Sequence, residues 1–239
     1  MKTKLFGILF VFLIMVLFGG VFTSCSKKDE PVASEKKWIT VYQNITLGNQ
    51  HNITNGHFLK LKTGESVKLE SVFAQQEYMA LMIFTDYGIN NTYLTFPANA
   101  ADAATFKDEL KTNRLFVQPS AGLNYWNTAK MTNGMVYQAP IMTANDFNNI
   151  IASKDWAVFD LNFKKNNGDE EKLSYKLAYE LEPQGGDIFL LQFNGLVRAI
   201  LYVKSYVKKA DNSTALTFDI IIESRASYTQ FDMAKNLQP

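Results

Sequence analysis

Residues 188–223 read IFLLQFNGLVRAILYVKSYVKKADNSTALTFDIIIE, and this stretch decides the fold. Its runs of β-branched, leucine and aromatic residues are interrupted at two places. Asn194-Gly195 is a dipeptide that favours a two-residue hairpin turn, because both residues tolerate positive φ angles. Asp211-Asn212-Ser213 is a second cluster of turn-forming residues. The stretch therefore predicts an antiparallel meander of three strands, over residues 188–193, 196–207 and 216–223.

The same strand signals continue toward the N-terminus. Residues 38–47 alternate in polarity, and residues 78–85 are apolar almost throughout, as expected for a buried strand. Thr63-Gly64-Glu65 lies between two strand-like segments and predicts a hairpin turn. Pro97 ends a further strand. The remaining strands are expected over residues 58–61, 66–73, 92–96, 114–118, 135–138, 156–163 and 173–181.

Two short helices interrupt these strands. Residues 99–110 are rich in alanine and place Phe106 and Leu110 four residues apart, on one face of a helix. Thr143 is a suitable N-cap for a helix through Ile151. The patterns together predict a mainly β protein, either an antiparallel β-sandwich or a bent, partly open β-barrel, with two short helices.

The β-rich globular domain is expected over residues 37–227, with a C-terminal tail over residues 228–239. Each half of the domain contains a long hairpin, at residues 78–96 and 188–207. This symmetry suggests two similar halves that divide near residue 154, although no residue-level repeat supports it. One large domain and two related halves therefore both remain open.

The N-terminus has the layout of a secretory leader. Two lysines precede an apolar run over residues 5–22, and Ser24 stands directly before Cys25, the only cysteine of the chain. This layout predicts a signal peptide over residues 1–24 that is cleaved after Ser24. The alternative is an uncleaved membrane anchor, since about 18 apolar residues are near the lower limit for a transmembrane helix.

Phe22-Thr23-Ser24-Cys25 resembles the bacterial lipobox, whose cysteine receives a diacylglycerol and becomes the first residue of the mature protein. Residues 26–30, Ser-Lys-Lys-Asp-Glu, resemble the charged export cluster of surface-exposed lipoproteins of Bacteroidetes-type outer membranes. The resemblance implies lipid on Cys25, attachment to the outer membrane through that lipid, and exposure to the exterior. Residues 25–36 lack apolar periodicity and are expected to form a flexible tether.

The C-terminal meander is similar to the tails of haem-capturing surface lipoproteins of the HmuY type, and this similarity implies capture of a small ligand such as haem. His51 and His57 are the only two histidines and lie in one polar stretch. Two imidazoles can hold a metal ion or a haem iron. Their neighbours are amides without a carboxylate, so two surface histidines without a ligand role are the other interpretation.

Composition and motifs disfavour nucleic-acid binding and catalysis. The formal net charge of +1 becomes +1 − 2 = −1 once the two lysines of the leader are removed. No basic surplus for nucleic acid, or for lipid head groups, is therefore expected. The chain contains no nucleophile elbow, phosphate-binding loop or dinucleotide fingerprint. Asp219 and Glu223 share one face of a strand, where a solvated surface is the simpler interpretation than a catalytic pair.

Residues 120–131 form a long irregular segment that carries Asn124, Tyr125, Trp126 and Asn127. Aromatic rings stack on sugars and the amides supply hydrogen bonds, so this segment is the predicted ligand-binding site; the alternative is that both rings plug the core. The sequence predicts a lipid-anchored, non-enzymatic binding or accessory module for extracellular glycan or a glycan-transport complex. Haem or small-ligand capture, and a structural role beside an outer-membrane protein, are the alternatives.

Overall fold

The computed structural model describes residues 36–69, 78–85, 91–102, 131–139, 141–167, 178–181, 185–194 and 197–225. The strands are β1 (Lys37–Gly48), β2 (Phe58–Lys60), β3 (Glu65–Val67), β4 (Met79–Thr85), β5 (Thr92–Thr95), β6 (Gly134–Gln138), β7 (Ala178–Leu181), β8 (Ile188–Phe193), β9 (Val197–Lys208) and β10 (Thr214–Arg225). The helices are α2 (Pro97–Asp102), α5 (Ala144–Ser153) and α6 (Trp156–Asn167).

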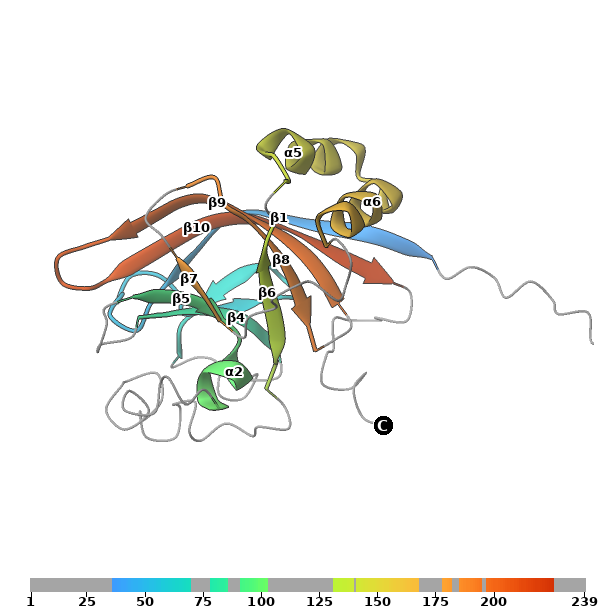
Figure 1. The fold of residues 1–239 in the computed structure, drawn as a ribbon. Coiled ribbons are helices and arrows are strands. Elements are labelled where there is room, and N and C mark those ends of the chain that lie inside the picture. The colour runs from blue at the N-terminus through green and yellow to red at the C-terminus, as the bar shows by residue number, and fades with distance from the viewer. Residues whose placement is uncertain are drawn as a thin grey trace, which may run out of the picture. The chain divides into compact units, whose positions relative to one another are not determined.

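Two five-stranded antiparallel sheets form the β-sandwich that the sequence predicts (Figure 1). Sheet A has the strand order β1-β10-β9-β8-β6, and sheet B has the order β3-β2-β4-β5-β7. The meander expected over residues 188–223 is the centre of sheet A, because β8 pairs with β9 and β9 pairs with β10. Strand β1 then pairs with β10 on its other side.

The main core lies between the two sheets. Every second residue of β10 enters it, as the period-2 geometry of a strand requires. These residues are Leu216, Phe218, Ile220 and Ile222, and all four are buried. Sheet B meets them with apolar side chains of β2, β4 and β5, including Leu59, Leu81, Ile83 and Leu94. The sandwich therefore rests on apolar packing.

A second core covers the other face of sheet A. Helices α5 and α6 supply Phe147, Ile150, Phe159 and Phe163, all buried. They pack on Ile188, Leu190, Ile200 and Ile221, which point away from sheet B. Figure 1 shows the two helices on one side of sheet A and sheet B on the other. One half of sheet A is therefore buried on both faces.

Two β-bulges flank the middle of β10. The register with β1 shifts between Tyr42 and Ile45, and the register with β9 shifts between Thr217 and Phe218. Asn44 has a positive φ of 56° at the first bulge. The bulges lie where sheet A passes from the part covered by helices to the part without them. Bulges bend and twist a strand, so sheet A changes direction at this point.

The Asp219 carboxylate holds the two bulges together. Its Oδ1 accepts the Asn44 N–H at 2.7 Å and lies 3.4 Å from Lys204 Nζ. Lys204 Nζ also donates to Asn44 Oδ1 at 2.6 Å. Asp219 is buried, so the sequence-based expectation of a solvated carboxylate at this position is wrong.

Local sequence signals account for several element boundaries. Asn194 has a φ of 49° at the predicted hairpin turn, and Gly64 has a φ of 71° at the other. A side chain at Gly64 would meet the Tyr42 ring. Helix α5 begins as predicted at Thr143, whose hydroxyl accepts the Asp146 N–H at 3.2 Å while its backbone N–H donates to Asp146 Oδ2 at 2.9 Å. This reciprocal pairing is a capping box.

The prediction of a strand over residues 156–163 is wrong, since these residues form helix α6. Asp155 Oδ1 accepts the Ala157 N–H at 2.8 Å, as an N-terminal cap does. Phe159 and Phe163 lie four residues apart and are both buried. Of the helix predicted over residues 99–110, the described part is in α2, and residues 103–110 lie outside the described ranges.

Both sheets mix strands from either side of residue 154. Strand β1 pairs with β10, and β5 pairs with β7. The chain from Lys36 onward forms one compact unit. The described residues therefore form a single domain and do not divide near residue 154. The tail over residues 228–239 and the strand expected over residues 114–118 lie outside the described ranges.

Substitution of Phe159 by Ala should destabilise the fold by about 3–5 kcal/mol, because it leaves a cavity in the core beneath the helices. The same change at Leu161, which is 68% exposed, should stay within about 0.5 kcal/mol. Chemical denaturation of the two variants measures the difference. In a strand, residues 159 and 161 would share a face, so equal losses would contradict the helix.

Candidate functional site

The residues that the sequence analysis singled out fall into two groups. Ser24, Cys25 and the segment Asn124, Tyr125, Trp126 and Asn127 lie outside the described residues. His51 and His57 lie within them, in the polar loop between β1 and β2. The geometry of this loop therefore bears directly on the hypothesis of a histidine ligand site.

Buried amide side chains hold this loop in place. Asn49 Nδ2 donates to Thr85 Oγ1 and to the Asn212 carbonyl, both at 2.8 Å, and Asn49 Oδ1 accepts the Thr214 N–H at 3.0 Å. Gln50 contacts the same strand, because its Oε1 accepts the Thr85 N–H at 3.0 Å. These amides satisfy main-chain groups of β4 and β10, so their role is to close one end of the sandwich.

His57 is buried inside this loop and engages the main chain on both sides of its ring. Nδ1 accepts the Leu69 N–H at 3.2 Å, and Nε2 lies 3.2 Å from the Asn52 carbonyl oxygen. Because Nδ1 accepts, Nε2 carries the proton and donates. The expectation of a surface side chain is wrong for His57. Neither ring nitrogen is presented to a haem iron in this arrangement.

His51 is only partly buried and does not share the environment of His57. Burial lowers the pKa of His51, and the nearby Asp211 carboxylate acts in the opposite direction. A lowered folded-state pKa means that the unfolded chain binds more protons at mildly acidic pH. His51 therefore contributes a stability that rises with pH up to about 6.5, its ordinary value.

The described residues contain no group of three or more His, Cys, Asp or Glu side chains arranged to hold a metal ion. Among the helices of the described ranges, none is both long and apolar enough to cross a bilayer.

A second buried polar cluster lies beneath helix α6. Arg198 of β9 donates through Nε to Glu223 Oε2 at 2.7 Å and also contacts it through Nη2. The same Nη2 lies 2.8 Å from Asp160 Oδ1 on α6. The guanidinium carbon lies 4.9 Å from the centre of the Phe163 ring and 5.6 Å from that of Phe159. One arginine thus joins two strands to the helix.

Glu223 is fully buried, which contradicts the solvated strand face expected from the sequence. Desolvation raises the pKa of Asp160, but hydrogen bonds from Lys164 and Arg198 outweigh this effect, and the net pKa lies below its ordinary value. A buried ion pair with full hydrogen bonding tolerates the low dielectric of the interior. The cluster anchors α6 to strands β9 and β10.

Among the described elements, neither a helix nor a sheet covers one surface of sheet A. Beyond the bulges, its outward residues form two rows across the strands. The first row is Thr46, Thr217 and Ser205, in which Thr46 Oγ1 lies 3.0 Å from Thr217 Oγ1, and the second contains Ala215 and Val207. These residues are partly or fully exposed, with Val207 exposed to 51%. We call them the open face: Thr46, Ser205, Val207, Ala215 and Thr217. Small and β-branched side chains give the open face a flat contact surface.

No family model, curated protein or solved structure matches this chain. Two candidate binding surfaces remain. The structure describes the open face, and the sequence alone indicates the segment over residues 124–127. In the sequence, Thr46, Thr217 and Ser205 each stand beside core residues of their own strands, which is the only local indication of the open face. The pairing of these strands becomes visible only in the fold.

Substitution of Arg198 by Met should destabilise the protein by about 3–5 kcal/mol, because it leaves the buried Glu223 carboxylate without the guanidinium. Adding Glu223→Gln should recover most of that loss. Lys164→Met removes only the exposed i,i+4 partner of Asp160 and should cost about 0.3–0.5 kcal/mol. Denaturant titration of all variants measures these differences, and a full-sized loss in the double variant would contradict the ion-pair account.

Proposed function

We propose that the protein is a lipid-anchored, non-enzymatic binding or accessory module on the outer-membrane surface. The observation that carries the proposal is the leader ending at Ser24-Cys25, followed by the charged cluster of residues 26–30. The β-sandwich begins at Lys37, soon after this address. Lipid on Cys25 would hold a folded binding domain close to the membrane.

Extracellular glycan, or a complex that transports it, is the proposed partner. Support comes from Asn124, Tyr125, Trp126 and Asn127, which combine stacking surface with amide hydrogen-bonding groups. Within the described residues, the His57 ring is engaged with main-chain groups on both sides. This use of His57 favours glycan binding over haem capture.

A structural role in an outer-membrane assembly is the second candidate, and the open face favours it. A flat sheet surface with exposed Val207 among hydroxyl side chains suits contact with another folded protein better than enclosure of a small ligand. In this second function the membrane address is the same and the partner is an outer-membrane protein.

Replacement of Cys25 by Ala should abolish incorporation of a palmitate analogue when the full-length chain is expressed in a related bacterium. The lipobox sulfur is the acceptor in the proposed modification, so the wild type alone should be labelled. Protease added to whole cells should degrade the labelled protein if it faces the exterior. An unlabelled wild type would contradict the anchor, and labelled but protease-resistant protein would contradict surface exposure.

Replacement of Trp126 by Ala should release the protein from a polysaccharide affinity gel without changing its thermal unfolding temperature. Loss of one stacking ring removes a large part of the contact area with a sugar. Trp38→Ala, at an exposed ring of β1, is the matched control and should leave retention unchanged. Co-purification with an outer-membrane protein, sensitive to Val207→Glu and without gel retention, would favour the assembly role instead.

A further inference from the structure

Both histidines of the chain lie in one loop, which joins the two sheets at one end of the sandwich. We call residues 49–57 the histidine loop. Toward sheet A, Asn52 Nδ2 donates to the Thr214 carbonyl at 2.9 Å, and Asn49 Oδ1 accepts the Thr214 N–H at 3.0 Å. Toward sheet B, Asn49 Nδ2 donates to Thr85 Oγ1 at 2.8 Å. Because histidine is the side chain that ordinarily titrates between about pH 5 and 8, mild acid acts on this chain at the histidine loop.

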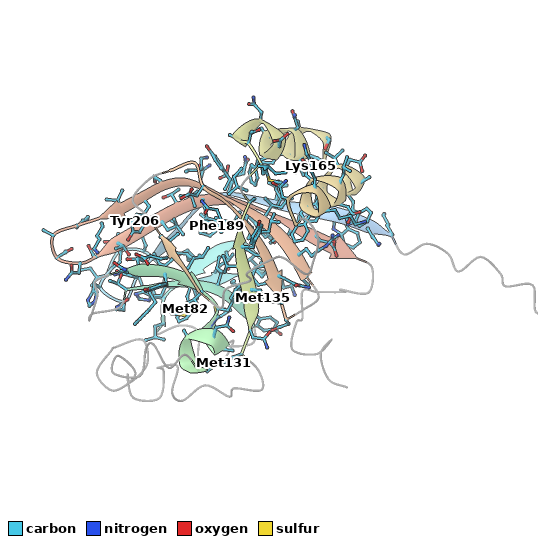
Figure 2. The ribbon with its side chains drawn as sticks, in the orientation of Figure 1. Met82, Met131, Met135, Lys165, Phe189 and Tyr206 are labelled. Carbon is cyan, nitrogen blue, oxygen red and sulfur yellow. The ribbon has the colours of Figure 1, made fainter. Side chains whose placement is uncertain are left out.

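The histidine loop lies far from the start of the domain and next to the open face. Strand β1 leads from Lys37 to Gly48 over 12 residues, which is about 40 Å at the usual rise of a strand. A Cβ atom at Gly48 would come within 2.6 Å of Asn52 Cβ, and Gly48 pairs with Ala215 of the open face. Figure 2 labels Tyr206, whose strand β9 reaches this end of the sandwich. The histidine loop therefore forms one border of the open face.

The contacts of His57 require the neutral form of its ring. Nδ1 accepts the Leu69 N–H at 3.2 Å, and Nε2 donates to the Asn52 carbonyl oxygen at 3.2 Å. A protonated ring carries an N–H at both positions, so its Nδ1 can no longer accept. The ring N–H and the Leu69 N–H would then face each other, and because both residues are buried, water does not replace the lost hydrogen bond. Proton uptake by His57 therefore requires the ring and Leu69 to separate.

Charged groups around the histidine loop act in both directions. Lys68 Nζ donates to a main-chain carbonyl of the loop at 2.9 Å, so its positive charge opposes a second one there. Burial lowers the pKa of His51, and the Asp211 carboxylate acts on His51 in the opposite direction. Glu70 and Asp86 each follow a described segment in the chain and lie outside the described residues. The mismatch at the Nδ1 atom of the buried ring does not depend on these charges, because it follows from the number of ring protons.

We propose that the histidine loop is an acid-sensitive switch, in which protonation of His57 separates its ring from Leu69. Leu69 follows β3 of sheet B, so the loop loses a side-chain contact on that side, while the amides of Asn49 and Asn52 keep it attached to β10. A neutral medium closes this end of the sandwich, and mild acid loosens it beside the open face. The switch lies within the folded domain and does not depend on the proposed lipid anchor.

Hydrogen exchange of the Leu69 amide in the full chain tests the switch, read by NMR from about pH 7.5 to about pH 5.5. Each rate is divided by the intrinsic exchange rate at the same pH, so that only the opening of the structure is compared. A released histidine ring takes up a proton with a pKa of about 6.5, so the opening equilibrium at Leu69 should rise about tenfold over this range. The Val203 amide, which donates to the Asp187 carbonyl at 2.8 Å, is the control and should keep its protection.

His57→Asn is the matched variant, because its Oδ1 can accept the Leu69 N–H near the position of Nδ1 and does not titrate. We expect this variant to protect Leu69 equally at both ends of the pH range, and His51→Gln to retain the full acid response. Constant protection of Leu69 in the wild type, or an equal loss in His57→Asn, would overturn the switch. If that variant does not fold, the ring carbon shifts of the wild type decide. Protonation of His57 in step with the loss of Leu69 protection supports the switch, and protonation without that loss rejects it.

Discussion

Residues 218–224 of strand β10 are buried on both faces of sheet A, and the rest of the structure depends on that constraint. Ile220 and Ile222 enter the core between the sheets, while Ile221 enters the core beneath the helices. A strand with two apolar faces needs a cover on each side. Sheet B supplies one cover and the α5–α6 layer supplies the other. Burial of Glu223 follows from the same arrangement, and Arg198 makes that burial tolerable.

Sequence reasoning identified those parts of the fold whose signals are local. Asn194 and Gly64 adopt the positive φ angles that their turns require, and Thr143 caps a helix through contacts three residues away. The pattern of helix α6 is ambiguous, because its apolar residues fit both the two-residue period of a strand and the 3.6-residue period of a helix. Trp156 and Val158 suggest the alternation of a strand, whereas Phe159 and Phe163 fit a helix. The Asp155 cap and the Asp160–Lys164 spacing were the signals that favoured the helix.

The polar groups were harder to predict, for a physical reason. Glu223 looks like a solvated carboxylate along its own strand, and only Arg198 from the neighbouring strand and a helix packed above both make it a buried one. His57 is similar, because its two partners are main-chain groups at Asn52 and Leu69 that no side-chain pattern reveals. Contacts between distant segments decide both cases. The candidate segment around Trp126 still rests on sequence alone.

The pairing of β1 with β10 has a consequence for the order in which the protein can fold. Thr40 and Ser224 meet across sheet A although 184 residues separate them in the chain. Sheet A is therefore incomplete until nearly the whole domain has been synthesised, and such long-range pairings form slowly. By joining β1 to β10, this topology delays closure of the sandwich until synthesis of the domain is nearly complete. For the secretory leader that we propose, such late closure would keep the nascent polypeptide open during translocation.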